Sequence, residues 1–335
     1  MNLFQNLFIA ISICFASICH AQQDWVSGLP NITPEQAENY VGFLADDLLE
    51  GRDAGTRGSR IAAGYIVSLL KDWGVTPLYS AGFYQPFDIY CGTKPTRTSW
   101  TIDSVAIENV KRQPAYGHRK LHNILAMIPG KITDECIVIG AHYDHDGINE
   151  DIEGDCIYNG ADDNASGVSA VLQIAKALKS TGKQPLRTII LAFWDGEEKG
   201  ALGSQYFVSN LPAQLSVKGY INFDMIGRGP IDNPQHLTYF YTAAYPMFER
   251  WLRKDMEKYN FAFTPDYRAW ESPTEGSDNA PFARAGIPIV WYHTEGHPDY
   301  HRPSDSAEKI DYKKLTDITR AAYLCTLRMA NTDDL

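Results

Sequence analysis

The apolar positions in the first hundred residues predict two helices. Residues 33–50 carry apolar side chains at helical spacing, with Thr33 in the place of an N-terminal cap and Gly51 where the pattern stops. Residues 58–74 show the same spacing. The stretch 84–118 mixes apolar and turn-forming residues and supports no clear assignment. We therefore expect an N-terminal helical pair.

Beyond residue 120, short apolar runs alternate with amphipathic segments. The predicted strands cover residues 121–128, 136–142, 188–194, 220–225, 237–243 and 287–293. The predicted helices cover residues 166–178, a segment near Ser204, and residues 245–259 and 311–328. Near-continuous apolar strands separated by helices are typical of a mostly parallel sheet covered on both faces. The predicted fold class is therefore α/β, with three α/β/α layers and the helical pair packed onto them.

The first 21 residues have the outline of a secretory leader. An apolar run over residues 7–18 is followed by the small residue Ala21, although no Lys or Arg precedes the run. The run is too short for a membrane span of about 20 residues. We expect cleavage after Ala21 and export to the periplasm or the medium. Lipoprotein anchoring at Cys19 fits less well, because Ile18 stands before it. Residues 22–335 show no repeats and no low-complexity linker, so we expect a single domain.

Composition narrows the classes of partner. With 335 residues, 44% of them hydrophobic, the chain can bury a large core. The net charge of −11 argues against a nucleic-acid partner, which calls for clustered Lys and Arg. The cysteines after the leader match no zinc-binding spacing. Cys91 and Cys156 lie in loop-like sequence and can pair in an exported protein, a question that the sequence leaves open.

Reactive side chains follow three of the predicted strands. His142 ends one strand and Asp144 comes two residues later, Glu197 and Glu198 follow the next, and Asp224 follows the third. Ligands of open α/β sheets bind beyond the carboxyl ends of the strands. Acids after strands are common because loops are polar, so a single one would carry little weight. Their expected convergence on one edge predicts a functional site there.

Two further candidate ligands lie in loops. Asp163, beside Asp162, precedes a predicted helix that Ser166 can cap, so a ligand role competes there with a helix-capping role. His301 lies in a loop after the last strand. The metal-competent residues are His142, Asp163, Glu198, Asp224 and His301.

Two imidazoles and three carboxylates suit Zn²⁺, and one carboxylate can bridge two ions roughly 3.5 to 4 Å apart. Because neighbouring side chains point in different directions, one of Glu197 and Glu198 can ligate while the other takes a proton from water. The sequence contains no HExxH, GxSxG or P-loop motif.

Six segments together resemble the M28 family of metallopeptidases. They are GAHYDH (140–145), GADDNASG (160–167), DGEEKGALGS (195–204), NFDMIGR (222–228), SDNAPFARAGIP (277–288) and YHRPSD (300–305). They occur in the family's order with family-like gaps, and residues 43–66 also resemble the start of bacterial members. The resemblance covers nearly all of the chain after the leader and implies a zinc exopeptidase-like fold.

The resemblance also implies roles for the residues that hold metal. Asp163 bridges two zinc ions. His142 and Asp224 lie on the side of one ion, and Glu198 and His301 hold the second ion. A cis peptide bond between Asp163 and Asn164 is implied as well.

The remaining roles follow from the same resemblance. Glu197 is the general base and acid, and Tyr300 donates a hydrogen bond to the oxyanion. Asp144 orients His142 and sets its tautomer, and Asp278 is a further supporting carboxylate.

The function implied is that of a secreted zinc aminopeptidase that hydrolyses the N-terminal residue of peptides with a free N-terminus, through a hydroxide that bridges the metals. The family also contains carboxypeptidases and dipeptidases. The substrate pocket is not placed by the sequence; its candidate wall, with core packing as the alternative, comprises Tyr267, Trp270, Phe282 and Tyr292.

Two alternatives compete with the peptidase. Glutaminyl cyclases share the fold and a DGEE segment but use one zinc ion to form N-terminal pyroglutamate; here GADDNASG follows the peptidase form, and DGEEKGALGS lacks the insertion expected in an animal-type cyclase. Some members of the fold have lost ligands and act as receptors, whereas all five ligand positions and the base are filled here. The number of zinc ions separates peptidase from cyclase.

Overall fold

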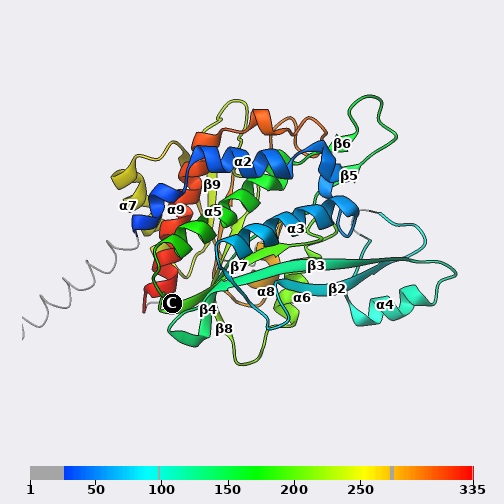
Figure 1. The fold of residues 1–335 in the computed structure, drawn as a ribbon, viewed down its shortest axis with the longest axis horizontal. Coiled ribbons are helices and arrows are strands. Elements are labelled where there is room, and N and C mark those ends of the chain that lie inside the picture. The colour runs from blue at the N-terminus through cyan, green and yellow to red at the C-terminus, as the bar shows by residue number, and fades with distance from the viewer. Residues whose placement is uncertain (1–25, 97–98, 272–274, 334) are drawn as a thin grey trace, which may run out of the picture.

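A computed structural model describes residues 26–96, 99–271, 275–333 and 335; the predicted leader, residues 1–21, lies outside them. Within this part of the chain, nine strands form one mixed sheet in the order β1-β3-β7-β4-β8-β11-β9-β10, with β2 paired to β3 (Figure 1). The strands are β1 (Thr76–Pro77), β2 (Tyr84–Cys91), β3 (Gly117–Ile128), β4 (Ile132–His142), β7 (Arg187–Trp194), β8 (Ser216–Phe223), β9 (His236–Thr242), β10 (Thr264–Trp270) and β11 (Ile289–His293).

The centre of the sheet is parallel and its flanks are mixed. Strands β7, β4, β8 and β11 run parallel to one another, whereas β3 pairs antiparallel with β7 and β9 pairs antiparallel with β11. In register, His142 lies beside Trp194 and Phe223 beside Tyr292. The carboxyl ends of the four central strands therefore lie at one edge. A separate hairpin is formed by β5 (Gly147–Ile148) and β6 (Ile157–Tyr158).

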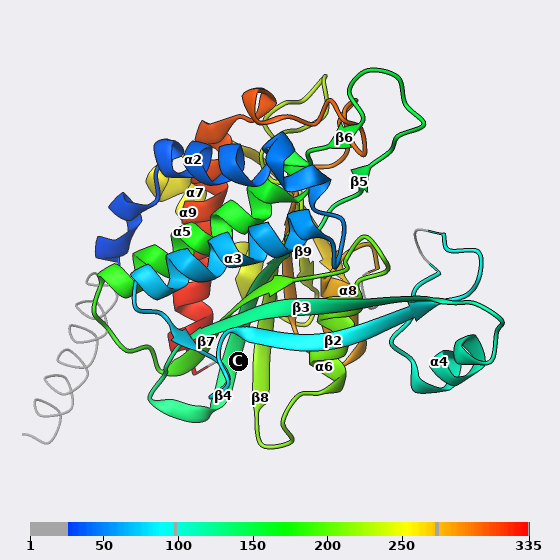
Figure 2. The same ribbon diagram turned by 45° about the vertical axis from the view of Figure 1, so that its right-hand side comes forward.

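Helices cover both faces of the sheet, as the view in Figure 2 shows. One face carries α2 (Pro34–Leu44), α3 (Arg57–Asp72), α5 (Gly167–Ser180), α7 (Met247–Tyr259) and α9 (Tyr312–Asn331). The other face carries α6 (Leu202–Ser209) and α8 (Asn279–Arg284). Helix α4 (Ser104–Lys111) lies in the connection between the paired strands β2 and β3. Shorter turns are η1 (Val26–Asn31), η2 (Asp47–Arg52), η3 (Ala161–Ser166) and η4 (Ala307–Lys309).

The core is split in two by the sheet. Along β4, Ile137 and Ile139 point into the larger cluster under α5 and α9, and Val138 points into the smaller cluster under α6 and α8. Strand β7 alternates in the same way, with Leu191 on the first side and Ile190 on the second. Every residue of β7 is buried. This two-sided burial explains why these strands have near-continuous apolar sequences, and it confirms the predicted three-layer α/β class.

The predicted helix over residues 33–50 is shorter than expected. Helix α2 ends at Leu44, and the following turn η2 contains Glu50 and Gly51 with φ of 53° and 63°. A left-handed backbone cannot continue a right-handed helix, so the apolar pattern spans two elements. At the helix predicted over residues 166–178, Ser166 does not cap α5 (Gly167–Ser180); the side-chain oxygen of Asn164 accepts the hydrogen bond from the Gly167 N–H instead.

The structure bears on three further expectations, which concern a disulfide, a membrane span and a single domain. The four described cysteines carry free thiols, so the Cys91–Cys156 disulfide is absent. No helix in the described ranges is long and apolar enough to cross a membrane. The single domain over residues 22–335 stays a prediction, and it is supported by α2 and α3, whose apolar faces join the main core cluster.

Candidate metal centre

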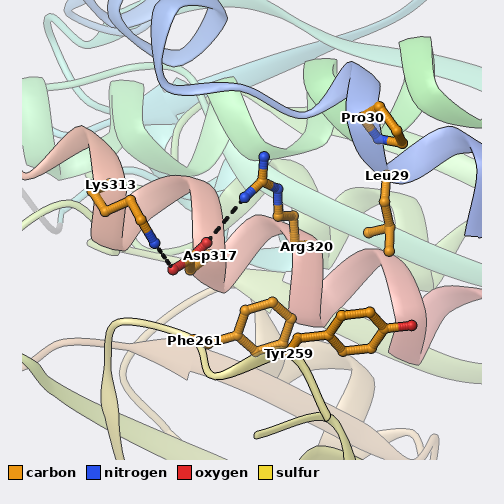
Figure 3. A pocket seen from close by; sticks show the side chains of 7 residues that line it. All are labelled: Leu29, Pro30, Tyr259, Phe261, Lys313, Asp317 and Arg320. Atoms are coloured by element: carbon orange, nitrogen blue, oxygen red, sulfur yellow. Dashed lines mark hydrogen bonds and ion pairs between the residues drawn. The ribbon is translucent and has the colours of Figure 1, made fainter.

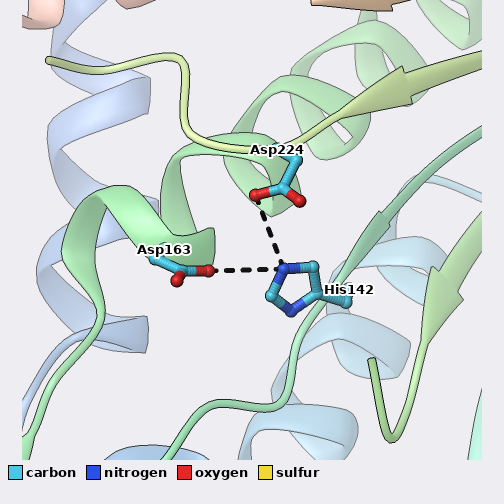
Figure 4. Close-up of side chains that lie close together, drawn as sticks. All are labelled: His142, Asp163 and Asp224. Carbon is cyan, nitrogen blue, oxygen red and sulfur yellow. Dashed lines mark ion pairs between the residues drawn. The ribbon is translucent and has the colours of Figure 1, made fainter. Parts of the chain in front are cut away.

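The five predicted ligands converge at the carboxyl edge of the sheet. His142 ends β4, Asp224 directly follows β8, and Asp163 lies in the turn η3 (Figure 4). Glu198 follows β7, and His301 lies in the loop between β11 and α9. Asp163 and Glu198 are each 3% exposed, and His142 is 1% exposed. The topology rule for open α/β sheets therefore locates this cluster correctly.

Asp163 stands between two groups of donors. Its Oδ1 atom lies 3.3 Å from His142 Nε2, and its Oδ2 atom lies 2.9 Å from His301 Nε2. Asp224 Oδ1 lies 3.7 Å from His142 Nε2, and Glu198 Oε1 lies 3.8 Å from His301 Nε2. The donor atoms of His142, Asp163 and Asp224 form one compact group, and those of Asp163, Glu198 and His301 form another. Asp163 is common to both, and the peptide bond that follows it is cis.

The neighbouring residues Glu197 and Glu198 point to different sides. Glu197 Oε2 lies 4.0 Å from His142 Nε2, whereas Glu198 Oε1 lies 2.8 Å from His145 Nδ1. Both backbone N–H groups donate to the carboxylate of Asp144, at 3.1 Å for Glu197 and 3.3 Å for Glu198. Asp144 therefore fixes the turn that carries the two glutamates.

Asp144 reaches His142 mainly through its backbone. Its carbonyl oxygen lies 3.2 Å from His142 Nδ1, whereas its carboxylate lies 3.8 Å away. An acceptor at Nδ1 leaves Nε2 free of a proton and able to bind a metal. The backbone carbonyl of Asp144 thus makes the contact that was expected to orient His142. Its carboxylate instead binds the turn that carries Glu197 and Glu198.

The buried charges change one another's pKa. Burial alone would lower the pKa of His142, but Glu197, Asp163 and Asp224 raise it well above its usual value. Burial alone would raise the pKa of Asp163, but His145, His142 and His301 hold it well below its usual value. Burial raises the pKa of Glu197 well above the normal range, with His142 opposing and Asp224 adding to the shift. Glu197 is thus a carboxyl group with a raised affinity for protons.

Tyr300 and Asp278 differ in their surroundings. The Tyr300 ring packs on the His301 ring with centroids 3.8 Å apart, and the residue is 46% exposed, so it reaches solvent beside the cluster. Asp278 is fully buried at the start of α8. Burial raises the pKa of Asp278 to about 7, against the opposing effect of His142.

The candidate aromatic wall is largely core. Phe282 and Tyr292 are fully buried in the two core clusters, so the packing alternative holds for both. Trp270 packs on Phe240, and Tyr267 packs on Tyr239.

Two neighbours of the cluster were not among the predicted site residues. His145 is fully buried, and its contact with Glu198 orients that carboxylate. Asp146 lies 3.5 Å from His301 Nδ1 through its Oδ2 atom. His145 is the last residue of the segment GAHYDH (140–145), and Asp146 comes directly after it.

The chemistry of this edge fits a divalent cation. Six carboxylates gather here, all of them buried except Glu197, whose side chain is 15% exposed; they are Asp144, Asp163, Glu197, Glu198, Asp224 and Asp278. Uncompensated buried carboxylates are costly, and a bound cation offsets that cost. Imidazole nitrogen together with carboxylate oxygen is a donor set that zinc prefers. The residues present therefore fit zinc.

A hollow of about 300 Å³ lies elsewhere, between η1, the end of α7 and α9 (Figure 3). Its charged residues are already paired, since Lys313 and Arg320 both contact Asp317. None of the predicted site residues lines it. The hollow is therefore separate from the chemistry at the sheet edge.

Known proteins resemble the chain in sequence. The model for peptidase family M28 matches residues 123–326. The chain is 34% identical over 195 residues to leupeptin-inactivating enzyme 1 of Streptomyces exfoliatus, covering 56% of this chain and 39% of that protein. It is 30% identical over 236 residues to a probable leucine aminopeptidase of Arthroderma otae, covering 64% and 61%. The match thus spans less than two thirds of the length of either relative.

Solved structures resemble it in fold. An aminopeptidase from Aneurinibacillus sp. strain AM-1 superimposes with a TM-score of 0.68 at 16% identity, covering 93% of this chain and 97% of the other. BSAP, a zinc aminopeptidase from Bacillus subtilis, superimposes with a TM-score of 0.64 at 17% identity, covering 91% and 97%. At this identity the likeness establishes the fold. None of these four proteins is named as a cyclase.

Proposed function

This chain belongs to peptidase family M28, and from that premise we propose that it is a zinc aminopeptidase that removes the N-terminal residue of peptides. The observation that carries the proposal is the position of Asp163 between His142 and His301, which suits a carboxylate shared by two ions. The names of the relatives, a probable leucine aminopeptidase among them, support it. Export stays a prediction from residues 1–21.

The residues that would hold zinc are the five of the cluster. His142, Asp163 and Asp224 form one donor group, and Asp163, Glu198 and His301 form the other. When bound, zinc would act as a Lewis acid on the scissile carbonyl and make a water molecule easier to deprotonate.

The other residues would handle protons and position groups. Glu197 takes a proton from the attacking water and returns it to the leaving amine, which its raised pKa favours. The Tyr300 hydroxyl, at the exposed side of the cluster, donates a hydrogen bond to the oxygen that gains charge. Asp144 holds the turn with Glu197 in place through two backbone hydrogen bonds. Carboxylates of the cluster attract the free α-amine of the substrate.

Purified protein should hydrolyse aminoacyl p-nitroanilides and lose that activity when a chelator removes the metal. N-acetylated versions of the same substrates should not be cleaved, because they lack the α-amine. A glutaminyl peptide should yield free glutamine by mass spectrometry. Pyroglutamate as the product would favour a cyclase, and cleavage only from the C-terminus would favour a carboxypeptidase; either result would overturn the proposal.

Zinc should also stabilise the fold. The ions would bind only the folded chain, because the donors come from segments as far apart as β4 and the loop before α9. At a free zinc concentration about 100 times the Kd, each independent site adds about 2.7 kcal/mol to the free energy of unfolding. Thermal unfolding of chelator-treated protein with added zinc measures this, and elemental analysis counts the ions. An unfolding midpoint that zinc leaves unchanged would contradict the proposed centre.

A further inference from the structure

Arg52 is a buried cation whose partners are backbone oxygens. It is 1% exposed and lies at the end of η2, outside the segment that matches the family model. Its Nε donates to the carbonyl of Tyr143 at 2.8 Å, Nη1 to that of Asn159 at 2.6 Å, and Nη2 to that of Gly160 at 3.0 Å. Nη1 also donates to the Leu44 carbonyl. One guanidinium thus ties together three separate segments of the chain.

Two of these segments carry proposed zinc ligands. Tyr143 directly follows His142, and Gly160 stands three residues before Asp163. The separation of His142 Nε2 and Asp163 Oδ1, 3.3 Å, depends on how the backbone of β4 is placed against the turn η3. The Arg52 guanidinium spans that junction. Because its fork of donors is planar and rigid, it can set the distance between the two segments.

The backbone around Arg52 is shaped to bring its side chain inside. Glu50, Gly51 and Arg52 are consecutive residues with positive φ, at 53°, 63° and 51°. A side chain at Gly51 would collide with the carbonyl oxygens of Gly147 and Tyr158, so this close approach requires glycine. The carbonyl of Arg52 also accepts a hydrogen bond of 3.2 Å from the backbone N–H of His145.

Lysine cannot replace this set of contacts. An ammonium group has three donors at one point, whereas Arg52 uses three nitrogens to reach four carbonyls. Burial lowers the pKa of Arg52 to about 10, with Asp163 and Asp144 opposing, so the group remains charged at neutral pH.

We propose that Arg52 is a positioning residue of the metal centre, which holds the backbone after His142 against the backbone before Asp163 and so sets their spacing for zinc. The inference rests on the proposed function. It assigns a role in the site to the N-terminal segment, which the family model does not cover.

The test compares two buried arginines. Arg187 is 5% exposed, donates to the carbonyls of Met329, Thr332 and Leu335, and pairs with Glu135 at 2.7 Å. It begins β7 at the edge opposite the site, whereas Glu197 follows the end of that strand. The variants are Arg52→Gln and Arg52→Lys, with Arg187→Gln and Arg187→Lys as matched controls.

Zinc affinity is measured by competition with a chelator, and kcat, KM and thermal unfolding are measured on the same samples. Arg52→Gln should weaken zinc binding about 10- to 100-fold and lower kcat with a smaller change in KM. Arg52→Lys should lie between Arg52→Gln and wild type, and it gives the readout if the glutamine variant does not fold. The Arg187 variants should lower the unfolding midpoint but change zinc affinity by less than about threefold.

The outcomes separate the inference from the function on which it rests. If folded Arg52 variants bind zinc as tightly as wild type, or no more weakly than the Arg187 variants, Arg52 has a general structural role and the inference is wrong. If the wild-type protein itself binds no zinc, the proposed function and this inference fall together.

Discussion

Replacing Glu197 with glutamine should lower kcat by about 10²- to 10⁴-fold while zinc stays bound. The side chain lies beside His142, with Oε2 4.0 Å from Nε2, but it belongs to neither donor group built around Asp163. Glutamine keeps the shape of the side chain and removes its ability to accept a proton. Steady-state kinetics with an aminoacyl p-nitroanilide measure the loss, and elemental analysis measures the zinc.

The matched control for this variant is Glu257→Gln, which changes an exposed glutamate on α7 and should leave kcat unchanged. Full activity in Glu197→Gln would show that another group takes the proton. A variant that loses both activity and zinc would show instead that Glu197 is a ligand. Thermal unfolding confirms that both variants are folded.

The three-layer architecture was predictable because strands buried on both faces leave a local apolar pattern in the sequence. Strand β7 and residues 136–142 of β4 are buried on both faces, so apolar residues are required at nearly every position, as in the run Thr188–Trp194. The convergence of His142, Glu198 and Asp224 follows from parallel strands that end at one edge. A site at that edge could therefore be expected without knowing the order of the strands in the sheet.

Strand β2 was not predictable in the same way. In β2 the residues Gln85, Phe87, Ile89 and Cys91 are buried and alternate with exposed neighbours, so a period of two is present. A glutamine on the buried face and Pro86 on the outer face weaken the apolar signal in the sequence. The strand is recognisable only through its partner β3 and the small cluster that Phe87 and Ile89 share with Leu121.

The supports of the site were missed for a different reason. Arg52 and His145 act through the Gly160 carbonyl and the Glu198 side chain, which are 108 and 53 residues away in sequence. Both residues lie in segments that resemble the family, but their contacts with a distant carbonyl and a distant side chain leave no spacing in the sequence. In the sequence, Glu50 belongs to the helix predicted over residues 33–50, and Gly51 and Arg52 give only the signal of a loop after it. The positions of His142, Glu198 and Asp224 follow from the strand ends, whereas those of Arg52 and His145 depend on tertiary packing.

Replacing Asp163 with asparagine should weaken both zinc sites and lower kcat/KM by about 10³-fold or more. Its two carboxylate oxygens face different partners, with Oδ1 3.3 Å from His142 and Oδ2 2.9 Å from His301. An amide offers one neutral oxygen in place of two charged ones. The Lewis-acid effect of zinc is worth several kcal/mol, and each 1.36 kcal/mol corresponds to a tenfold change in rate.

Variants that remove a histidine from only one donor group test whether the two groups share Asp163. His301→Ala removes a donor from one group only and should leave a protein that still binds one zinc ion through His142, Asp163 and Asp224. His142→Ala should spare the other group. If Asp163 bridges the ions, the Asp163→Asn variant should contain less zinc by elemental analysis than either histidine variant, because both of its sites lose a charged oxygen. An Asp163→Asn protein that holds as much zinc as wild type would show that the two groups are independent and that the carboxylate between them is not a ligand.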